Sequence, residues 1–335
     1  MIKKKIYFIS EIASSHTGKT QDVFKLSKLH LKSKSNYLKY QIFKTKYLYP
    51  KKEINFKKFK KFEISYSNWL KIINRFKKKT KLILEPFDAE SYSFCKKFRE
   101  HVSLKISTSE SDNFELINDA LKNFKKVFLN LSGFKEKEID LILSNLKKTK
   151  HTNKIVLMYG FQSYPSKLKK MRFNLFKKFQ NNKFLYGYAD HSIYGLSNEF
   201  ISSAFLAANL KCSYYEKHVC LDIKKKPIDY ISSVHFSDLD KIINKIKYKK
   251  PLNINFNLKN KNIFSVEEKK YADEMHKKAF TKYKLKKNSM IGIKDLVFLR
   301  SKEKGGVKRL DMYKQNLFLK KDLEPNKFLK KSYVN

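Results

Sequence analysis

Residues 102–131 read VSLKISTSESDNFELINDALKNFKKVFLNL, and this stretch decides the fold class. Val102–Ile106 is a short apolar run with the composition of a strand, and Val127–Leu131 repeats it. Asn113–Asn123, between the two runs, has the apolar spacing of a helix. A strand, a helix and a second strand in this order predict two parallel strands that are joined by a crossover helix.

The same unit recurs along the first two thirds of the chain. Six further runs have strand character, namely Ile6–Ser10, Tyr37–Gln41, Leu82–Pro86, Ile155–Met158, Phe184–Tyr188 and Ser213–Glu216. Helical stretches separate most of them, for example Asp22–Lys32, Ser67–Lys77, Glu136–Lys147 and Leu196–Leu210. Eight such units in about 220 residues predict an α/β fold of the (β/α)8 TIM-barrel type. A doubly wound open sheet is the alternative, but 8 glycines in the whole chain leave little material for a glycine-rich nucleotide turn.

The alternation of strands and helices ends near residue 247. Residues 248–264 (YKKPLNINFNLKNKNIF) have the composition of a polar linker. Residues 265–335 contain short apolar runs broken by turn pairs such as Gly305-Gly306 and Glu324-Pro325. We therefore predict a barrel domain at 1–247, a linker at 248–264 and a small C-terminal domain at 265–335.

The formal net charge of +44 comes from lysine, because only five of the 75 basic residues are arginine. Proteins that read nucleic acid favour arginine, and here lysine is scattered along the entire chain. We therefore expect no specific nucleic-acid partner. A catalytically inactive basic barrel that binds nucleic acid or another polyanion remains the alternative. No apolar run approaches the roughly 20 residues of a membrane span, and Glu11 interrupts the first apolar run. A cytoplasmic protein without membrane contact is expected.

Polar side chains follow every predicted strand, at the end where a (β/α)8 barrel carries its active site. Lys39 and Lys105 lie inside apolar runs, where a buried ammonium group is costly unless an anion neutralises it. A phosphate or carboxylate group of a substrate would supply that anion.

Two histidines, His191 and His218, follow the seventh and eighth predicted strands. Neighbouring strands lie about 4.8 Å apart, so both imidazoles could bind one divalent metal, with Glu11 or water completing its coordination. Glu216 lies two residues before His218 and faces the same side of its strand. One core histidine and one hydrogen-bonded surface histidine are the alternative reading of this pair.

Together these segments resemble the sialic acid synthase family, whose members condense phosphoenolpyruvate with a sugar to form nonulosonic acids. The matching stretches are Glu11–Gly18, Leu38–Phe43, Pro86–Asp88, Leu104–Ile106, Ser163–Pro165, Gly187–His191 and Glu216–Asp222. They cover the barrel in order and at compatible spacing. The C-terminal segment resembles, more distantly, the small antifreeze-like (SAF) domain of that family.

The resemblance implies a homodimer in which the SAF domain of one subunit covers the barrel mouth of the other. It implies a divalent metal, usually Mn²⁺ with Mg²⁺ or Co²⁺ as alternatives, on His191 and His218. The substrates would be phosphoenolpyruvate and an open-chain acylated amino sugar such as N-acetylmannosamine, and the product would serve surface glycan biosynthesis. Glu11, Glu216 and Lys39 are the implied catalytic residues. The implied substrate-binding residues are Lys105, Ser109, Lys126, Gln162, Tyr164, Asp190 and Asp229.

Several positions depart from the family pattern. The family has a histidine- and cysteine-containing segment where this chain has Tyr159–Gln162, and a serine where it has Ala189. Asp229–Ser233 and the pair Lys277-Lys278 also differ, and both correspond to sugar-contacting segments of the family. We therefore expect the reaction type to be retained and the acceptor sugar to differ. An aldolase or a sugar-phosphate isomerase on the same barrel is a third hypothesis.

Overall fold

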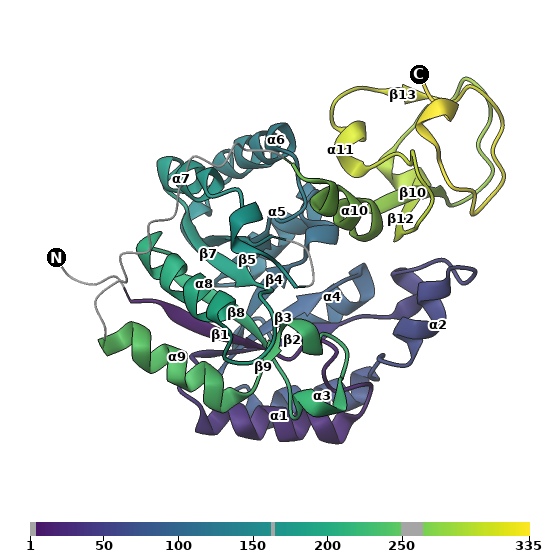
Figure 1. Cartoon of the computed structure of the whole chain (residues 1–335). Coiled ribbons are helices and arrows are strands. Elements are labelled where there is room, and N and C mark those ends of the chain that lie inside the picture. The colour runs from purple at the N-terminus through teal and green to yellow at the C-terminus, as the bar shows by residue number, and fades with distance from the viewer. Residues whose placement is uncertain (1–4, 162–164, 249–263) are drawn as a thin grey trace.

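A computed structural model describes residues 5–161, 165–248 and 264–335. Eight parallel strands are arranged in chain order, and the first pairs with the last, so the sheet is closed (Figure 1). The strands are β1 (Tyr7–Glu11), β2 (Tyr37–Ile42), β3 (Lys81–Pro86), β4 (Val102–Ile106), β5 (Val127–Asn130), β6 (Ile155–Tyr159), β7 (Leu185–Asp190) and β8 (Tyr214–Val219). This closed sheet confirms the predicted TIM barrel.

Helices cover the outer face of the barrel (Figure 1). They are α1 (Thr20–Lys32), α3 (Tyr66–Phe76), α4 (Ala89–Lys96), α5 (Phe114–Asn123), α6 (Glu136–Lys147), α7 (Asn174–Asn181), α8 (Asn198–Asn209) and α9 (Phe236–Tyr248). Helix α2 (Ile54–Lys60) lies apart from this layer, in the segment between β2 and α3 and close to the C-terminal segment (Figure 1). Helix α3 illustrates how the sequence forms these helices. Ser65 caps its first turn by accepting from the Asn68 N–H, and its apolar face, which includes Trp69 and Ile73, is buried against the barrel. A two-residue strand, β9 (Ser233–Val234), pairs with β8 and was not predicted.

The barrel interior is apolar at one end and polar at the other. At the end where the strands begin, Tyr7, Tyr37, Phe128 and Tyr214 pack with ring centroids 4.9–6.2 Å apart. Because side chains alternate along a strand, Tyr7 and Ile9 on β1 are followed on the same face by Glu11. The aromatic cluster closes one end and leaves the polar groups at the other, the barrel mouth.

The C-terminal segment has a hydrophobic core of its own, which includes Ala279, Leu296, Val307 and Leu329. Its elements are α10 (Val266–Met275), β10 (Lys277–Thr281), β11 (Met290–Ile291), β12 (Leu296–Arg300), α11 (Arg309–Met312) and β13 (Leu317–Phe318). Strands β10 and β12 are antiparallel partners, as are β11 and β13. Most of the predicted linker lies outside the described residues, so the domain boundaries remain a prediction.

His30 of α1 is a buried histidine far from the mouth, and it gives the fold a pH dependence. Its ring nitrogens lie 2.8 Å from Thr80 Oγ1 and 3.4 Å from Ser10 Oγ, and burial lowers its pKa to about 4. Between that value and the ordinary 6.5, the unfolded chain binds more protons. Stability is therefore lost as the pH falls through this window, by about 3 kcal/mol for this one group.

The slope of the unfolding free energy against pH is set by how many more protons the unfolded chain binds than the folded one, and His30 contributes up to one of them. We expect the variant His30→Gln to remove that contribution and to make the slope smaller. Urea unfolding at several pH values between 4 and 6.5 measures that slope. A slope that equals that of the unsubstituted protein would contradict the assignment.

Candidate active site

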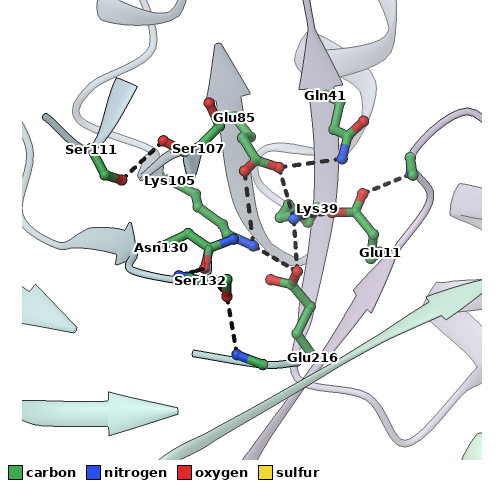
Figure 2. A network of polar contacts seen from close by, with 12 residues as sticks. Glu11, Lys39, Gln41, Glu85, Lys105, Ser107, Ser111, Asn130, Ser132 and Glu216 are labelled. Carbon is green, nitrogen blue, oxygen red and sulfur yellow. Dashed lines mark hydrogen bonds and ion pairs between the residues drawn. The ribbon is translucent and has the colours of Figure 1, made fainter. Parts of the chain in front are cut away.

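A buried cluster of two lysines and three glutamates occupies the barrel mouth (Figure 2). Lys39 Nζ lies 2.8 Å from both Glu85 Oε2 and Glu216 Oε1, and it also pairs with Glu11 Oε2. Lys105 Nζ lies 2.6 Å from the same Glu216 oxygen. Five different side chains from β1, β2, β3, β4 and β8 thus converge at one point, and each is nine-tenths or more buried.

The strand register explains this convergence. Glu11 is the register partner of Lys39, and Gln41, two residues on, is the partner of Glu85. Side chains two apart share a face, so all of these groups point into the barrel. Gln41 Nε2 donates to Glu85 Oε2 at 3.4 Å, which extends the cluster outward (Figure 2).

The cluster is polarised. Burial alone would raise the pKa of Glu216, but the charges of Lys105 and Lys39 outweigh it and hold that pKa well below its usual range. Burial lowers the pKa of Lys39, although Glu216 and Glu85 oppose the shift. With all five groups ionised, three carboxylates face two ammonium groups, so the cluster carries one excess negative charge. Such a site can exchange protons and attracts a cation.

The predicted histidine pair is brought together beside this cluster. His191 directly follows β7 and His218 lies in β8, and their ring centroids are 5.3 Å apart. Burial lowers the pKa of His191 to about 4 and that of His218 well below its ordinary value. Both imidazoles are therefore neutral near pH 7, which is the form that binds a metal ion.

These residues fit a divalent metal as a pair of nitrogen donors, with the remaining positions left to substrate and water. The buried Glu216 Oε2, two residues before His218, has no hydrogen-bond partner among the described residues, and its negative charge favours a nearby cation. No group of three or more His, Cys, Asp or Glu side chains is placed to hold a metal in the described parts of the chain. Glu11, which was predicted as the alternative to water for completing the coordination, accepts from the Ala13 N–H at 2.6 Å and pairs with Lys39.

Asp190 does not point into the mouth. Its carboxylate lies 2.8 Å from Lys217 Nζ and 2.6 Å from Ser192 Oγ, and it accepts from Tyr215 Oη at 2.9 Å. Lys217 Nζ also donates to the Ser192 carbonyl at 2.9 Å. The structure therefore does not bring Asp190 together with the other predicted site residues, and its predicted substrate contact finds no support here. The ion pair instead fixes the chain on both sides of His191, and Lys217 adjoins His218.

Breaking this ion pair is expected to be costly. Lys217→Met leaves the Asp190 carboxylate buried without its cation, so the free energy of unfolding should fall by about 3–5 kcal/mol. The double variant Asp190→Asn with Lys217→Met should recover most of that loss, because no unpaired charge remains. Urea unfolding of both variants measures the difference, and equal losses would contradict the pairing.

The structure separates one more predicted residue from the mouth. Lys126 immediately precedes β5, and its Nζ donates to Tyr214 Oη at 2.6 Å at the opposite, aromatic end of the barrel. The structure therefore does not bring Lys126 together with the other predicted site residues, and its predicted contact with phosphoenolpyruvate finds no support here. Lys126 precedes its strand, so it lies at the amino end of the barrel, away from the cluster at the mouth.

Other predicted residues lie around the mouth or outside the described chain. Asp229 has a left-handed backbone (φ 67°), burial raises its pKa to about 6, and the Ser14 backbone N–H opposes that shift. Asp229 therefore lies beside the loop after β1. Ser109 follows β4 and exchanges a 2.8 Å hydrogen bond with Ser107. Gln162 and Tyr164 lie outside the described residues.

The C-terminal segment contributes two arginines that were not predicted for the site, Arg300 and Arg309, together with Lys277 of the pair named above. Lys277 and Arg309 both pair with Glu110, which follows β4, and Arg309 Nη2 lies 3.1 Å from that carboxylate. Arg300 Nη2 donates to Ser109 Oγ at 3.3 Å. Glu85 and Glu110 are among the polar residues that follow the predicted strands, whereas the cations that pair with Glu110 and Ser109 lie at least 167 residues away in sequence.

Tyr159, which departs from the family pattern, has a side chain that points away from the barrel interior. Tyr159 ends β6 and donates to Glu268 Oε1 of α10 at 3.3 Å, away from the barrel interior. Gly160, next to it, allows close packing, because a Cβ there would lie 1.8 Å from the Ala189 carbonyl oxygen. Tyr159 therefore joins the barrel to α10 and does not line the mouth.

Comparison with known proteins agrees with this geometry. A family model described as the NeuB family matches residues 13–252. Among solved structures, the spore coat polysaccharide biosynthesis protein spsE of Bacillus subtilis has a TM-score of 0.79 at 15% identity, covering 99% of this chain and 95% of that one. The N-acetylneuraminic acid synthetase of Leptospira borgpetersenii serovar Hardjo-bovis, in complex with citrate, has a TM-score of 0.65 at 22% identity, covering 73% and 84%.

A truncated 3-deoxy-D-arabino-heptulosonate 7-phosphate synthase of Thermotoga maritima has a TM-score of 0.56 at 13% identity, covering 73% of this chain and 86% of that one. These identities support the fold alone.

No curated protein sequence matches the chain. Within the described residues, no helix is both long and apolar enough to cross a membrane. The family match spans the barrel and most of its strand-end residues, so this chain belongs to the NeuB family.

Proposed function

We propose that the protein condenses phosphoenolpyruvate with an open-chain acylated amino sugar, giving a sialic-acid-like nonulosonic acid and phosphate. The observation that carries this proposal is the juxtaposition of the buried Lys–Glu cluster with two neutral histidines at the barrel mouth. Neutral imidazoles suit a metal that polarises a carbonyl, and a buried ion cluster suits proton transfer beside it. The family membership supports the same reaction class.

In the proposed reaction, C3 of phosphoenolpyruvate attacks the sugar aldehyde, water adds to C2, and phosphate leaves with cleavage of its C–O bond. Lys39 would donate a proton to the aldehyde oxygen, because burial lowers its pKa and favours proton release. Glu216 Oε2, ionised and without a hydrogen-bond partner among the described residues, would orient the incoming water and accept its proton. Glu11 and Glu85 would keep Lys39 in place.

His191 and His218 would hold the divalent metal, Mn²⁺ in the first instance. When bound there it would act as a Lewis acid on the aldehyde oxygen. The pair Asp190–Lys217 would maintain the orientation of both histidines from behind the sheet, as outer partners of metal ligands commonly do.

The proposed function also includes an acceptor sugar and a role for the C-terminal segment. We propose N-acetylmannosamine or a related sugar, with Asp229 at its binding site and with a product used in surface glycans. The C-terminal segment would act as the SAF-like cap of the mouth. In this chain the segment contacts its own barrel through Lys277, Arg300 and Arg309, and an exchange of these contacts between two subunits remains a prediction.

The test is phosphate release from phosphoenolpyruvate by the purified protein with Mn²⁺, across a panel of acylated amino sugars. Release should require both the metal and one particular sugar, and the product should contain three more carbons than that sugar. Sugar-independent release, or no release although the protein binds Mn²⁺ and phosphoenolpyruvate, would contradict the proposed condensation with this substrate class.

A further inference from the structure

The loops at the amino end of the barrel, opposite the mouth, carry charge of almost one sign. They join the end of each helix to the start of the next strand and comprise residues 33–36, 77–80, 97–101, 124–126, 148–154, 182–184 and 210–213, with residues 5–6 before β1. Glu100 is the one acidic residue in these described loops. Their basic residues are Lys5, Lys34, Lys77, Lys78, Lys79, Lys97, Arg99, Lys125, Lys126, Lys148, Lys150, Lys154, Lys183 and Lys211.

The lysine-rich composition of the chain does not by itself produce this excess. The whole chain has 75 basic and 31 acidic residues, and that ratio would place several acidic residues in these loops. The loops at the mouth end do carry both signs. Glu110 and Asp112 follow β4, and Asp222 and Asp229 lie near Lys224 after β8. The positive charge is therefore concentrated at the amino end.

Most of this charge is exposed and uncompensated. All of the basic side chains in the amino-end loops are exposed except Lys77, Lys126 and Lys154. Within the described residues, only Arg99 and Lys125 of the set form an ion pair, and both pair with Glu100, at 3.6 Å and 3.7 Å. Such a one-signed surface creates a field that attracts an extended anionic partner.

The centre of this end is closed, which argues against a nucleic acid as the partner. Tyr37 and Tyr214 of the aromatic cluster are buried, and so are Phe98, Phe124 and Phe184, the phenylalanines of the loops. The loops therefore present no aromatic ring of Phe, Tyr or Trp on which an unpaired base could stack. Proteins that read duplex DNA rely on arginine, and among these basic residues only Arg99 is one.

The arrangement of the loops favours a flat anionic surface. Loops at one end of a closed barrel form a ring, so a plane laid against that end meets several of them at once. Two apolar side chains adjoin the ring. Leu31, in the last turn of α1, is 40% exposed, and Leu185, which begins β7, is 38% exposed. Lysines with a few apolar side chains on one face are typical of peripheral contact with anionic lipid headgroups.

We propose that the amino end of the barrel is an electrostatic docking surface for an anionic lipid bilayer, with the mouth turned away from the bilayer. Lysine supplies point charges and not bidentate forks, so the surface recognises charge density and no single headgroup. The expectation of no membrane contact rested on the absence of a membrane span, which peripheral contact does not need. The proposal is independent of the proposed function.

Co-sedimentation of the full chain with vesicles tests the proposal. The vesicles consist of phosphatidylcholine alone or of phosphatidylcholine and phosphatidylglycerol in equal parts. Binding should require phosphatidylglycerol, and it should weaken at least about tenfold between about 0.1 M and 0.5 M salt, because salt screens the attraction.

Two matched variants locate the contact. The first changes Lys78, Lys79, Lys148 and Lys150 of the amino-end loops to glutamine, and it should weaken binding about a hundredfold. The control changes Lys224, Lys225, Lys320 and Lys327 to glutamine. These four lysines are also exposed but lie after β8 and in the C-terminal segment. The control loses the same net charge, and it should keep the affinity within about threefold.

Each other outcome overturns the proposal. Equal losses in the two variants would mean that net charge alone causes adhesion. No binding of the unsubstituted protein to the phosphatidylglycerol vesicles, or equal binding to the neutral vesicles, would exclude electrostatic docking to a bilayer. Binding of a single-stranded RNA oligonucleotide, without binding to the anionic vesicles, would assign the surface to nucleic acid instead.

Discussion

Replacing His191 or His218 by alanine is expected to lower metal-dependent turnover about a thousandfold or more. The two imidazoles are the neutral nitrogen donors beside the cluster, with ring centroids 5.3 Å apart, and each variant removes half of that pair. A Lewis-acid metal stabilises transition-state charge by several kcal/mol, and about 4 kcal/mol corresponds to a thousandfold change in rate. Phosphate release at saturating substrates measures turnover, and electron paramagnetic resonance of Mn²⁺ measures binding of the ion.

His30→Gln is the matched control, because His30 is also a buried, neutral histidine but lies on α1 at the outer face of the barrel. It should keep the Mn²⁺ affinity and the turnover of the unsubstituted protein at pH 7. Retention of both properties in His191→Ala and His218→Ala would remove the metal assignment.

Replacing Lys39 by methionine is the second change with a large expected effect. Lys39 contacts Glu11, Glu85 and Glu216, so its loss leaves three carboxylates at the mouth with Lys105 as the remaining cation of the cluster. We expect turnover to fall about a thousandfold, because both the proposed proton donor and the positions of the glutamates are lost. The free energy of unfolding should also fall by about 3–5 kcal/mol.

Two further variants separate catalysis from stability. Lys126→Met removes a lysine at the opposite end of the barrel and should leave turnover unchanged. The double variant Lys39→Met with Glu85→Gln removes one charge of each sign, so it should recover stability without recovering turnover. Recovery of turnover in that double variant would show that Lys39 acts only as a structural counter-ion.

The sequence was sufficient to predict the barrel because each strand is short, apolar and bounded by polar residues. Val102–Ile106 and Tyr37–Gln41, for example, were placed within one residue of the strands found. The position of Lys39 and Lys105 inside apolar runs predicted two buried lysines, and in the structure Glu216, and not only a substrate, supplies an anion to both of them. The sequence predicts such positions because side chains alternate along a strand, and this alternation decides which of them point into the barrel.

The remaining features depend on contacts that periodicity does not encode. Asp190 and Lys217 face each other behind the sheet, which becomes evident only when the register of β7 and β8 is known. Lys126 lies one residue before its strand, at the wrong end of the barrel. Arg300 and Ser109 are 191 residues apart in sequence, and their contact depends on how the C-terminal segment packs on the barrel.

The most direct test of the central claim uses phosphoenolpyruvate labelled with ¹⁸O at the oxygen that bridges C2 and phosphorus. The labelled compound is incubated with the protein, Mn²⁺ and the sugar that supports phosphate release, and the phosphate is analysed by mass spectrometry. Condensation with C–O cleavage predicts that the ¹⁸O leaves with the phosphate. Phosphate without the label would mean cleavage of the P–O bond, and it would contradict the proposed reaction at this site.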